Sequence, residues 1–424
     1  MKVRYIYSAC VEIETANTRI LCDPWFSEGA FDGSWFHYPK SNDPLKVLKR
    51  PDYIYISHIH QDHYDKVFLK KILKKYKKAQ IIIPNFKRNY LLNRMKFDGI
   101  PAKPLNHLKI KKTNIHLVPN EYDLNDIDSG IIINDGKNTT LGLVDCVYNK
   151  NFSFKLKKVI NTYTNKLDLL MAPHSGANNF PHTHFNYKFE KKQLKKWSDW
   201  KKRFNLDRYK QWCTLFKSDY HLPYAGKYVL GGKNIRFNKY YGVMDPIDIK
   251  KADNKAVILD DYGGEIDLNS GKITNERKKK YNQKKINSYL NKIKKFKYQY
   301  ENEIKIPFNS INFKKLFGKS YLKALNFSEV KSDYFYCFRL FKDEKPLGFS
   351  AFFNTNKKKK PNIIFNKVLK KPVTIVNIDY RLVFGLLTGI YHWDNASVGS
   401  LFESKRIPYK YNENATNFLN FLNI

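Results

Sequence analysis

The sequence lacks any run of 18 or more apolar residues. Its most apolar stretch, 373–391, is interrupted by Asp379 and Arg381, which excludes a transmembrane helix there. The first ten residues, MKVRYIYSAC, have no apolar segment behind their basic residues, so we expect no secretory signal.

Cysteine is also scarce. The five cysteines are an odd number, they are widely spaced, and no Cys-x-x-Cys pair occurs. This pattern argues against a disulfide framework and against a cysteine zinc ribbon. We therefore expect reduced thiols and a cytoplasmic protein.

Acidic residues are few: 39 Asp and Glu stand against 77 Lys and Arg, for a formal net charge of +38. With 42% hydrophobic and 16% aromatic residues the chain is not disordered, and 424 residues allow two to three domains. The charge has two open interpretations, a general compositional bias towards Lys, Asn, Ile and Tyr, or a surface selected for polyanions. Both favour an anionic substrate. Nucleic acid is less favoured, because no known nucleic-acid module is recognisable.

Composition divides the chain into three parts. Residues 1–262 alternate short strand patterns with amphipathic helices and form the expected catalytic domain. Residues 263–305 are polar and very basic, and we interpret them as a bridging segment. Residues 306–424 begin with a helical pattern, continue with strands and end with helices, which is typical of a small α+β domain.

The strongest chemical signal is His58-Ile59-His60-Gln61-Asp62-His63. A short apolar strand pattern, 53–57, precedes it, and a helical pattern, 66–78, follows it. His58 and His60 alternate as on a strand end and therefore point to one side, whereas Asp62 and His63 can face a second metal. Imidazoles and a carboxylate suit zinc, iron or manganese, so we predict one or two divalent metals here.

This motif, placed after a buried strand, resembles the signature of the metallo-β-lactamase fold superfamily. The resemblance implies an αββα sandwich with a metal site at one edge of its paired sheets. It also implies that Asp145, at the end of the strand pattern 140–145, bridges the metals. Asp62 and Asp145 are then the expected catalytic carboxylates, orienting a metal-activated water.

Within the superfamily the chain most resembles the metallo-β-lactamase-like region of the CMP-N-acetylneuraminate hydroxylases. Several short motifs carry this resemblance in the same order along the chain: Leu21 to Trp25, Ala30 to Trp35, Tyr53 to His58, Val144 to Cys146, Gly176 to Pro181, Pro223 to Gly226 and Ile390 to His392. The implied function is a hydrolase or oxygenase acting on an anionic sugar or nucleotide sugar.

The chain departs from that family in one respect. The hydroxylases carry a Rieske iron–sulfur domain, whose ligands are Cys-x-His and Cys-x-x-His pairs. No cysteine of these 424 residues lies two or three positions before a histidine. We therefore expect no bound Rieske cluster, and an oxygenase reaction would need a separate electron-transfer protein.

The remaining ligands are less clear. Superfamily members supply further histidines, but the corresponding stretches here offer Glu121, Asp123 and His221 as tentative metal ligands. A carboxylate in place of an imidazole shifts the preference towards iron or manganese.

Four residues are candidate substrate contacts. His174 and Asn178 lie in a polar, glycine-containing loop after the strand pattern 169–171, and this loop could either line the site or be an ordinary surface loop. Trp25 and Trp35 could either form a wall over the metals or close the edge of the sandwich.

Three function classes remain open. The first is the metal-dependent hydrolase or oxygenase, and the second is a metallo-β-lactamase-fold nuclease or phosphodiesterase, which the charge would suit. The third is a non-catalytic binding protein with a degenerate metal site. The tail resembles the sterol-carrier-protein-like fold through Leu386 to Gly389, which implies a small domain with an apolar pocket or an oligomer contact.

Overall fold

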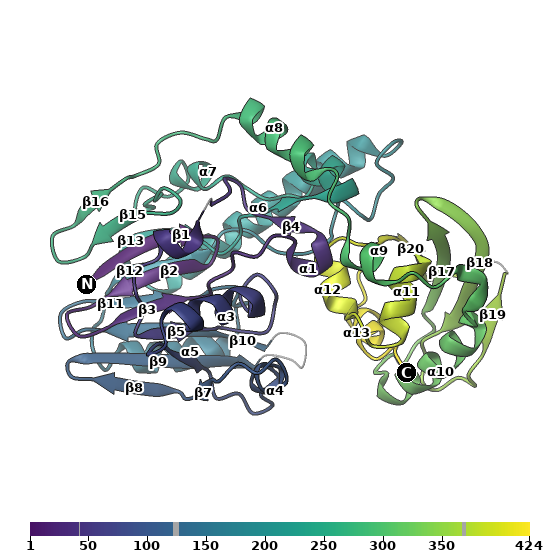
Figure 1. The fold of residues 1–424 in the computed structure, drawn as a ribbon, viewed down its shortest axis with the longest axis horizontal. Coiled ribbons are helices and arrows are strands. Elements are labelled where there is room, and N and C mark those ends of the chain that lie inside the picture. The colour runs from purple at the N-terminus through teal and green to yellow at the C-terminus, as the bar shows by residue number, and fades with distance from the viewer. Residues whose placement is uncertain (42, 122–126, 367–369) are drawn as a thin grey trace.

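A computed structural model describes residues 1–41, 43–121, 127–366 and 370–424. Two β-sheets lie face to face in the N-terminal part, and a third sheet stands apart in the C-terminal part (Figure 1). No helix in the described ranges is long and apolar enough to cross a membrane.

The first sheet has eight strands in the order β16-β15-β1-β2-β3-β5-β6-β7. Its strands are β1 (Lys2–Tyr7), β2 (Cys10–Glu14), β3 (Arg19–Cys22), β5 (Tyr53–Tyr55), β6 (Gln80–Ile83), β7 (Lys103–Pro104), β15 (Gly264–Asp267) and β16 (Lys272–Thr274). β3, β5 and β6 are parallel, so their carboxyl ends meet at one edge of the sheet.

The second sheet has six strands in the order β13-β12-β11-β10-β9-β8. They are β8 (His107–Ile110), β9 (Thr113–Glu121), β10 (Ile127–Asn134), β11 (Thr139–Gly142), β12 (Leu167–Pro173) and β13 (Ser218–Tyr224). β11, β12 and β13 are parallel and end at the same edge.

The core lies between these two sheets because their strands alternate apolar side chains inward. Val3, Ile13 and Ile20 of the first sheet pack in one buried cluster with Leu117 and Ile131 of the second. Helices cover both outer faces. α3 (Lys66–Lys75) and α4 (Tyr90–Phe97) pack on the first sheet, and α5 (Lys150–Ile160) and α6 (Lys191–Leu215) pack on the second. The expected αββα sandwich is confirmed.

Shorter elements lie in the segments that connect the main strands and helices. They are α1 (Ala30–Gly33), β4 (Trp35–Phe36), α2 (Pro44–Val47), β14 (Val229–Leu230), η1 (Gly232–Lys239), α7 (Pro246–Lys250), α8 (Gln283–Ile293), α9 (Gln299–Glu303) and η2 (Phe308–Ser310). β15 pairs with β1, and β16 pairs with β15, so residues 264–274 belong to the first sheet although their polar sequence favoured a bridging segment. The domain boundaries themselves stay a prediction.

The C-terminal part is a mixed α+β unit, as expected. Its sheet has the order β19-β18-β17-β20-β21, formed by β17 (Phe335–Lys342), β18 (Lys345–Asn354), β19 (Ile363–Phe365), β20 (Val373–Asp379) and β21 (Glu403–Ile407). Its helices are α10 (Phe313–Phe327), α11 (Tyr380–Leu387), α12 (Trp393–Val398) and α13 (Glu413–Asn420). The sterol-carrier-protein-like detail stays a prediction.

α12 reaches back from the C-terminal part to the left-handed turn α1 of the sandwich (Figure 1). Phe31 and Asp32 in this turn have φ of 53° and 58°. The approach is close, since a Cβ added at Gly399 would lie 2.9 Å from the carbonyl oxygen of Phe31. Gln61 fixes the turn from below by accepting the Phe31 N–H at 2.6 Å. The metal-motif loop, the turn and α12 are thus in direct contact.

Candidate metal centre

Two sets of ligand atoms lie at the edge where the parallel strands of both sheets end. His58, His60 and Asp145 form the first set, and Asp62, His63 and Asp145 form the second. Within each set the three ligand atoms lie within 4.8 Å of one another. Asp145 is common to both, so the two sets form two adjacent candidate cation sites joined by one carboxylate.

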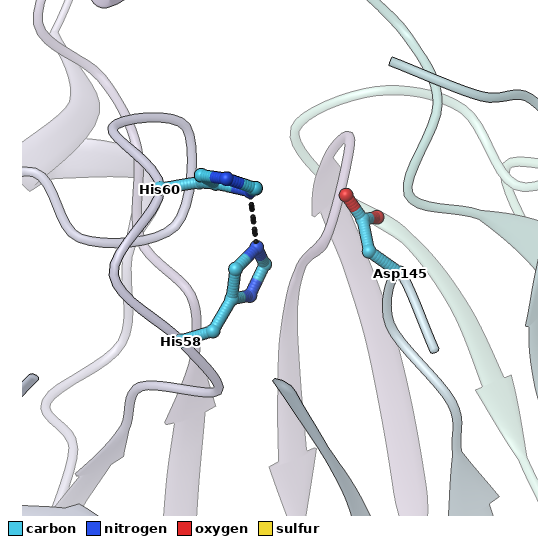
Figure 2. Close-up of side chains that lie close together, drawn as sticks. All are labelled: His58, His60 and Asp145. Carbon is cyan, nitrogen blue, oxygen red and sulfur yellow. Dashed lines mark hydrogen bonds between the residues drawn. The ribbon is translucent and has the colours of Figure 1, made fainter. Parts of the chain in front are cut away.

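The strand ends explain why these residues meet. His58 follows β5 after two buried residues, whereas Asp145 follows β11 on the opposing sheet. Figure 2 shows His58 and His60 on one loop and Asp145 facing them from the other side. Ligands fixed at the ends of packed strands are held in place without an ion.

Hydrogen bonds around His58 determine which of its ring nitrogens carries the proton. Ser57 Oγ donates its single hydrogen to Asp23 Oδ2 at 2.7 Å, so it can only accept from His58 Nδ1, which lies 2.9 Å away. The lone pair of His58 is therefore on Nε2, the nitrogen that faces His60.

His60 and His63 are held in the same manner. His60 Nε2 donates to Asp394 Oδ2 at 2.9 Å, which leaves the lone pair on Nδ1. His63 Nδ1 donates to Asp23 Oδ2 at 3.0 Å, and its Nε2 lies 3.4 Å from Asp62 and 3.5 Å from Asp145. Each imidazole thus uses one nitrogen for a protein partner and turns the other inward, the usual arrangement around a metal.

This arrangement fits a cation. His58 Nε2 and His60 Nδ1 are 2.9 Å apart, so their two lone pairs would repel unless a proton or a metal ion lay between them (Figure 2). Imidazole and carboxylate donors suit zinc, iron and manganese. His58, His60, Asp62, His63 and Asp145 would hold one or two such ions.

The electrostatics point the same way. Burial opposes a charge on His63, but the carboxylates of Asp62, Asp145 and Asp23 outweigh it and hold the His63 pKa well above its usual range. Burial likewise opposes a charge on His60, but its partner Asp394 and the nearby carboxylates raise the pKa of His60 to about 9. The carboxylates therefore demand positive charge at this edge, which bound protons or metal ions can provide.

The two further candidate ligands that the structure describes lie elsewhere. Glu121 accepts the Lys87 N–H at the end of β9, and Asp123 falls outside the described residues. His221 lies on β13, where strand alternation turns its side chain towards α6, and its Nδ1 pairs with Asp253 at 2.7 Å. The structure thus separates His221 from the centre. The other five ligands predicted from the sequence come together.

Three of the four candidate substrate contacts are buried, and the fourth is exposed. Trp25 and Trp35 are buried, which favours their role in closing the sandwich edge. His174 is buried after β12, where its Nδ1 pairs with the Tyr224 carbonyl oxygen at 3.1 Å. Asn178 is exposed and accepts the Phe180 N–H. Their role in substrate binding stays a prediction.

Three residues at the centre escaped the sequence analysis. Asp23 holds Ser57 and His63, and Asp394 holds His60 from a separate sheet domain. Tyr228 stacks on Trp35 with ring centroids 3.4 Å apart. Burial raises the pKa of Tyr228 well above its usual range, and the charges of Asp62 and Asp145 contribute. Of these three residues, Asp23 had a signal in the sequence, because it lies at a strand end within the Leu21 to Trp25 motif.

The chain is similar in sequence to a known family domain and to several known proteins. Residues 2–128 match the model of the beta-lactamase superfamily domain. The resemblance to the metallo-β-lactamase superfamily is thereby confirmed. The chain is also 27% identical over 255 residues to the cytidine monophosphate-N-acetylneuraminic acid hydroxylases of Pongo pygmaeus and Macaca mulatta.

These alignments cover 54% of this chain and 39% and 38% of the two hydroxylases. The chain therefore spans about two fifths of the relatives' length. Among solved structures, the isothiocyanate hydrolase from Delia radicum gut bacteria is 12% identical with a TM-score of 0.45, covering 63% of this chain and 99% of that one. A possible metal-dependent hydrolase from Veillonella parvula is 14% identical with a TM-score of 0.43, covering 63% and 98%.

Proposed function

We propose that this chain is a metal-dependent enzyme that acts on an anionic sugar or nucleotide sugar, by hydrolysis or by oxygen insertion. The observation that carries the proposal is the pair of ligand sets sharing Asp145, with one nitrogen of each imidazole held by a protein partner and the other turned inward. The net charge of +38 and the name of the hydroxylase relatives support an anionic sugar substrate.

The protein's own groups would divide the work. Bound divalent metals would supply Lewis-acid chemistry, polarising a substrate oxygen and lowering the pKa of water. Asp23, Ser57 and Asp394 keep the three imidazoles in one tautomer each. Asp62 and Asp145 present carboxylate oxygens beside His63 Nε2, where they can orient a nucleophile and accept its proton. Tyr228 and Trp35 would exclude water from one side of the centre.

The test combines metal content with product analysis. Elemental analysis of protein purified without added metal comes first, since about two irons per chain would favour oxygen chemistry and zinc would favour hydrolysis. Metal-reconstituted protein is then incubated with cytidine monophosphate-N-acetylneuraminic acid, and the iron form also receives oxygen and a chemical reductant. Hydrolysis yields the nucleotide and the free sugar, whereas hydroxylation leaves the molecule intact with one more oxygen atom.

The control is the double variant H58A/D62A, which removes one ligand from each set. We expect it to lose both metal and turnover. An unchanged metal count in this variant would refute the proposed centre. A metal-loaded protein without turnover on this compound, or on a panel of nucleotide sugars, would instead favour the non-catalytic binding protein.

The charge also keeps a nuclease or phosphodiesterase as a second candidate. Such an activity would fall steeply with salt, because contacts to a polyanion release counterions. Turnover of a single-stranded oligonucleotide at 50 and 200 mM salt distinguishes it from a nucleotide sugar, whose few anionic groups give a shallow dependence.

A further inference from the structure

A second group of side chains that could hold a metal ion lies on the outer face of the second sheet. Cys213 of α6, His221 of β13 and Asp253 after α7 each place a ligand atom within 4.8 Å of the other two. Sulfur, nitrogen and oxygen donors from three separate elements therefore converge, and none of them belongs to the centre around Asp145.

The backbone fixes all three elements. His221 N–H donates to the Lys255 carbonyl oxygen at 3.1 Å, and Val257 N–H donates to the His221 carbonyl oxygen at 2.8 Å, so the segment carrying Asp253 runs beside β13. Tyr209, one helical turn before Cys213, donates its hydroxyl to Asp253 Oδ2 at 2.8 Å. Donors on rigid, mutually bonded elements need little rearrangement to bind an ion.

The protonation states leave room for a cation. Burial works to raise the pKa of Asp253, but hydrogen bonds from His221 and Tyr209 outweigh it and lower that pKa. Asp253 is therefore an ionised ligand at neutral pH. Burial and the Asp253 charge together raise the pKa of the Cys213 thiol to about 12. A thiolate beside this carboxylate is unfavourable unless a positive ion neutralises both.

We propose that Cys213, His221 and Asp253 bind one zinc-type divalent cation, with Tyr209 or water in the fourth position. The bond lengths of zinc, about 2.0 to 2.3 Å, place tetrahedral ligands roughly 3.3 to 3.8 Å apart. Because the three ligand atoms already lie within 4.8 Å of one another, the widest pair needs to close by at most about 1.5 Å. As the ion binds, the Cys213 Sγ–H gives up its proton to solvent, and His221 binds through Nδ1 in the neutral tautomer that carries its proton on Nε2. The ion would tie α6 to the edge strand β13.

Cobalt(II) provides a selective probe. Within the described part of the chain, the two ligand sets around Asp145 contain histidine and aspartate only. A thiolate-to-cobalt charge-transfer band in the near ultraviolet therefore reports the Cys213 group and not that centre. We expect the full-length apoprotein to develop this band, saturating at one cobalt per chain.

Two variants distinguish the sites. C213S should abolish the charge-transfer band and leave cobalt binding around Asp145, whereas D145A should retain the band. C146S is the matched control, because Cys146 is a buried thiol next to Asp145 that donates to Asp128. C213S keeps the hydrogen bonds among Tyr209, His221 and Asp253, so we expect it to fold, with an unchanged circular dichroism spectrum.

The proposal is overturned if the apoprotein shows no charge-transfer band, or if the band persists in C213S. In either case the three side chains form only a hydrogen-bonded network. The outcome is independent of the proposed function, because D145A removes the catalytic centre without touching this group.

Discussion

Asp394 offers the sharpest test of how the two parts of the chain cooperate. Its carboxylate accepts from His60 Nε2 at 2.9 Å across 334 positions of sequence, and it enters the site on α12. A carboxylate behind a ligating histidine fixes the ring and its tautomer and raises the basicity of the nitrogen that faces the metal. We therefore predict that D394A weakens binding of a divalent cation at the His58–His60–Asp145 set.

The size of the effect can be bounded. Removing such a partner lowers metal affinity about 10- to 100-fold, which corresponds to roughly 1.4 to 2.7 kcal/mol. The side chains of His60 and Asp394 are 29% and 42% exposed, and solvent screens part of their interaction. We therefore expect about a 10-fold loss for D394A. D394N should lose less, because its amide oxygen still accepts the His60 N–H.

The assay is competition between the protein and a chromophoric chelator for zinc, which resolves the two binding steps. One step should weaken in D394A and the other, at Asp62 and His63, should not. D343N is the control, since Asp343 is 64% exposed and pairs with Arg381 away from the centre. Wild-type affinity for both ions in a folded D394A protein would refute the role of the C-terminal domain in the centre.

Three further predictions follow from single side chains. D145A should lose both metal ions in elemental analysis, because Asp145 belongs to both ligand sets, and retention of one ion would exclude the shared carboxylate. Burial raises the pKa of Asp32 to about 6 in the folded protein. The unfolded chain therefore loses this proton at a lower pH than the folded protein does, and the free energy of unfolding falls as the pH rises from about 4 to 6. D32N should therefore raise the free energy of unfolding at pH 7 by up to ~3 kcal/mol in urea titrations, and an unchanged value at pH 7 would contradict this. Burial lowers the pKa of Lys201 to about 7, so the destabilisation caused by its buried charge decreases as the pH rises above 7. K201M should therefore increase the free energy of unfolding more at pH 6 than at pH 9. Equal increases at the two pH values would contradict this prediction.

The local part of the site, the strand before His58 and the His58–His60 pair, could be predicted from the sequence. The apolar strand before His58 and the alternation of His58 and His60 predict a ligand pair at a strand end, and β5 confirms that strand. The two apolar strand patterns ending near His58 and Asp145 are both buried strands, as expected. Local periodicity carries this information because each strand buries its own residues.

The partners of the ligands depend on tertiary arrangement instead. Asp23 meets Ser57 because β3 lies parallel beside β5, and that strand order is not encoded in either segment alone. Asp394 meets His60 because α12 packs on the turn at Phe31. The sequence offers His221 as a ligand because it lies in the stretch where superfamily members supply a late histidine. The face of β13 that it occupies, however, depends on the register of a sheet formed by distant residues.

These partners also determine what the chain does without metal. Each of the three imidazoles is oriented by a different side chain, Ser57, Asp394 or Asp23. These side chains lie at the ends of packed strands or on a packed helix. Metal binding then need not organise the site, in contrast to small domains that fold only around their ion. Chelation should consequently abolish turnover while leaving the thermal unfolding transition of the sandwich within a few degrees of its metal-loaded value. A collapse of that transition on chelation would mean that the metals, and not the strand ends and their carboxylates, hold this edge together.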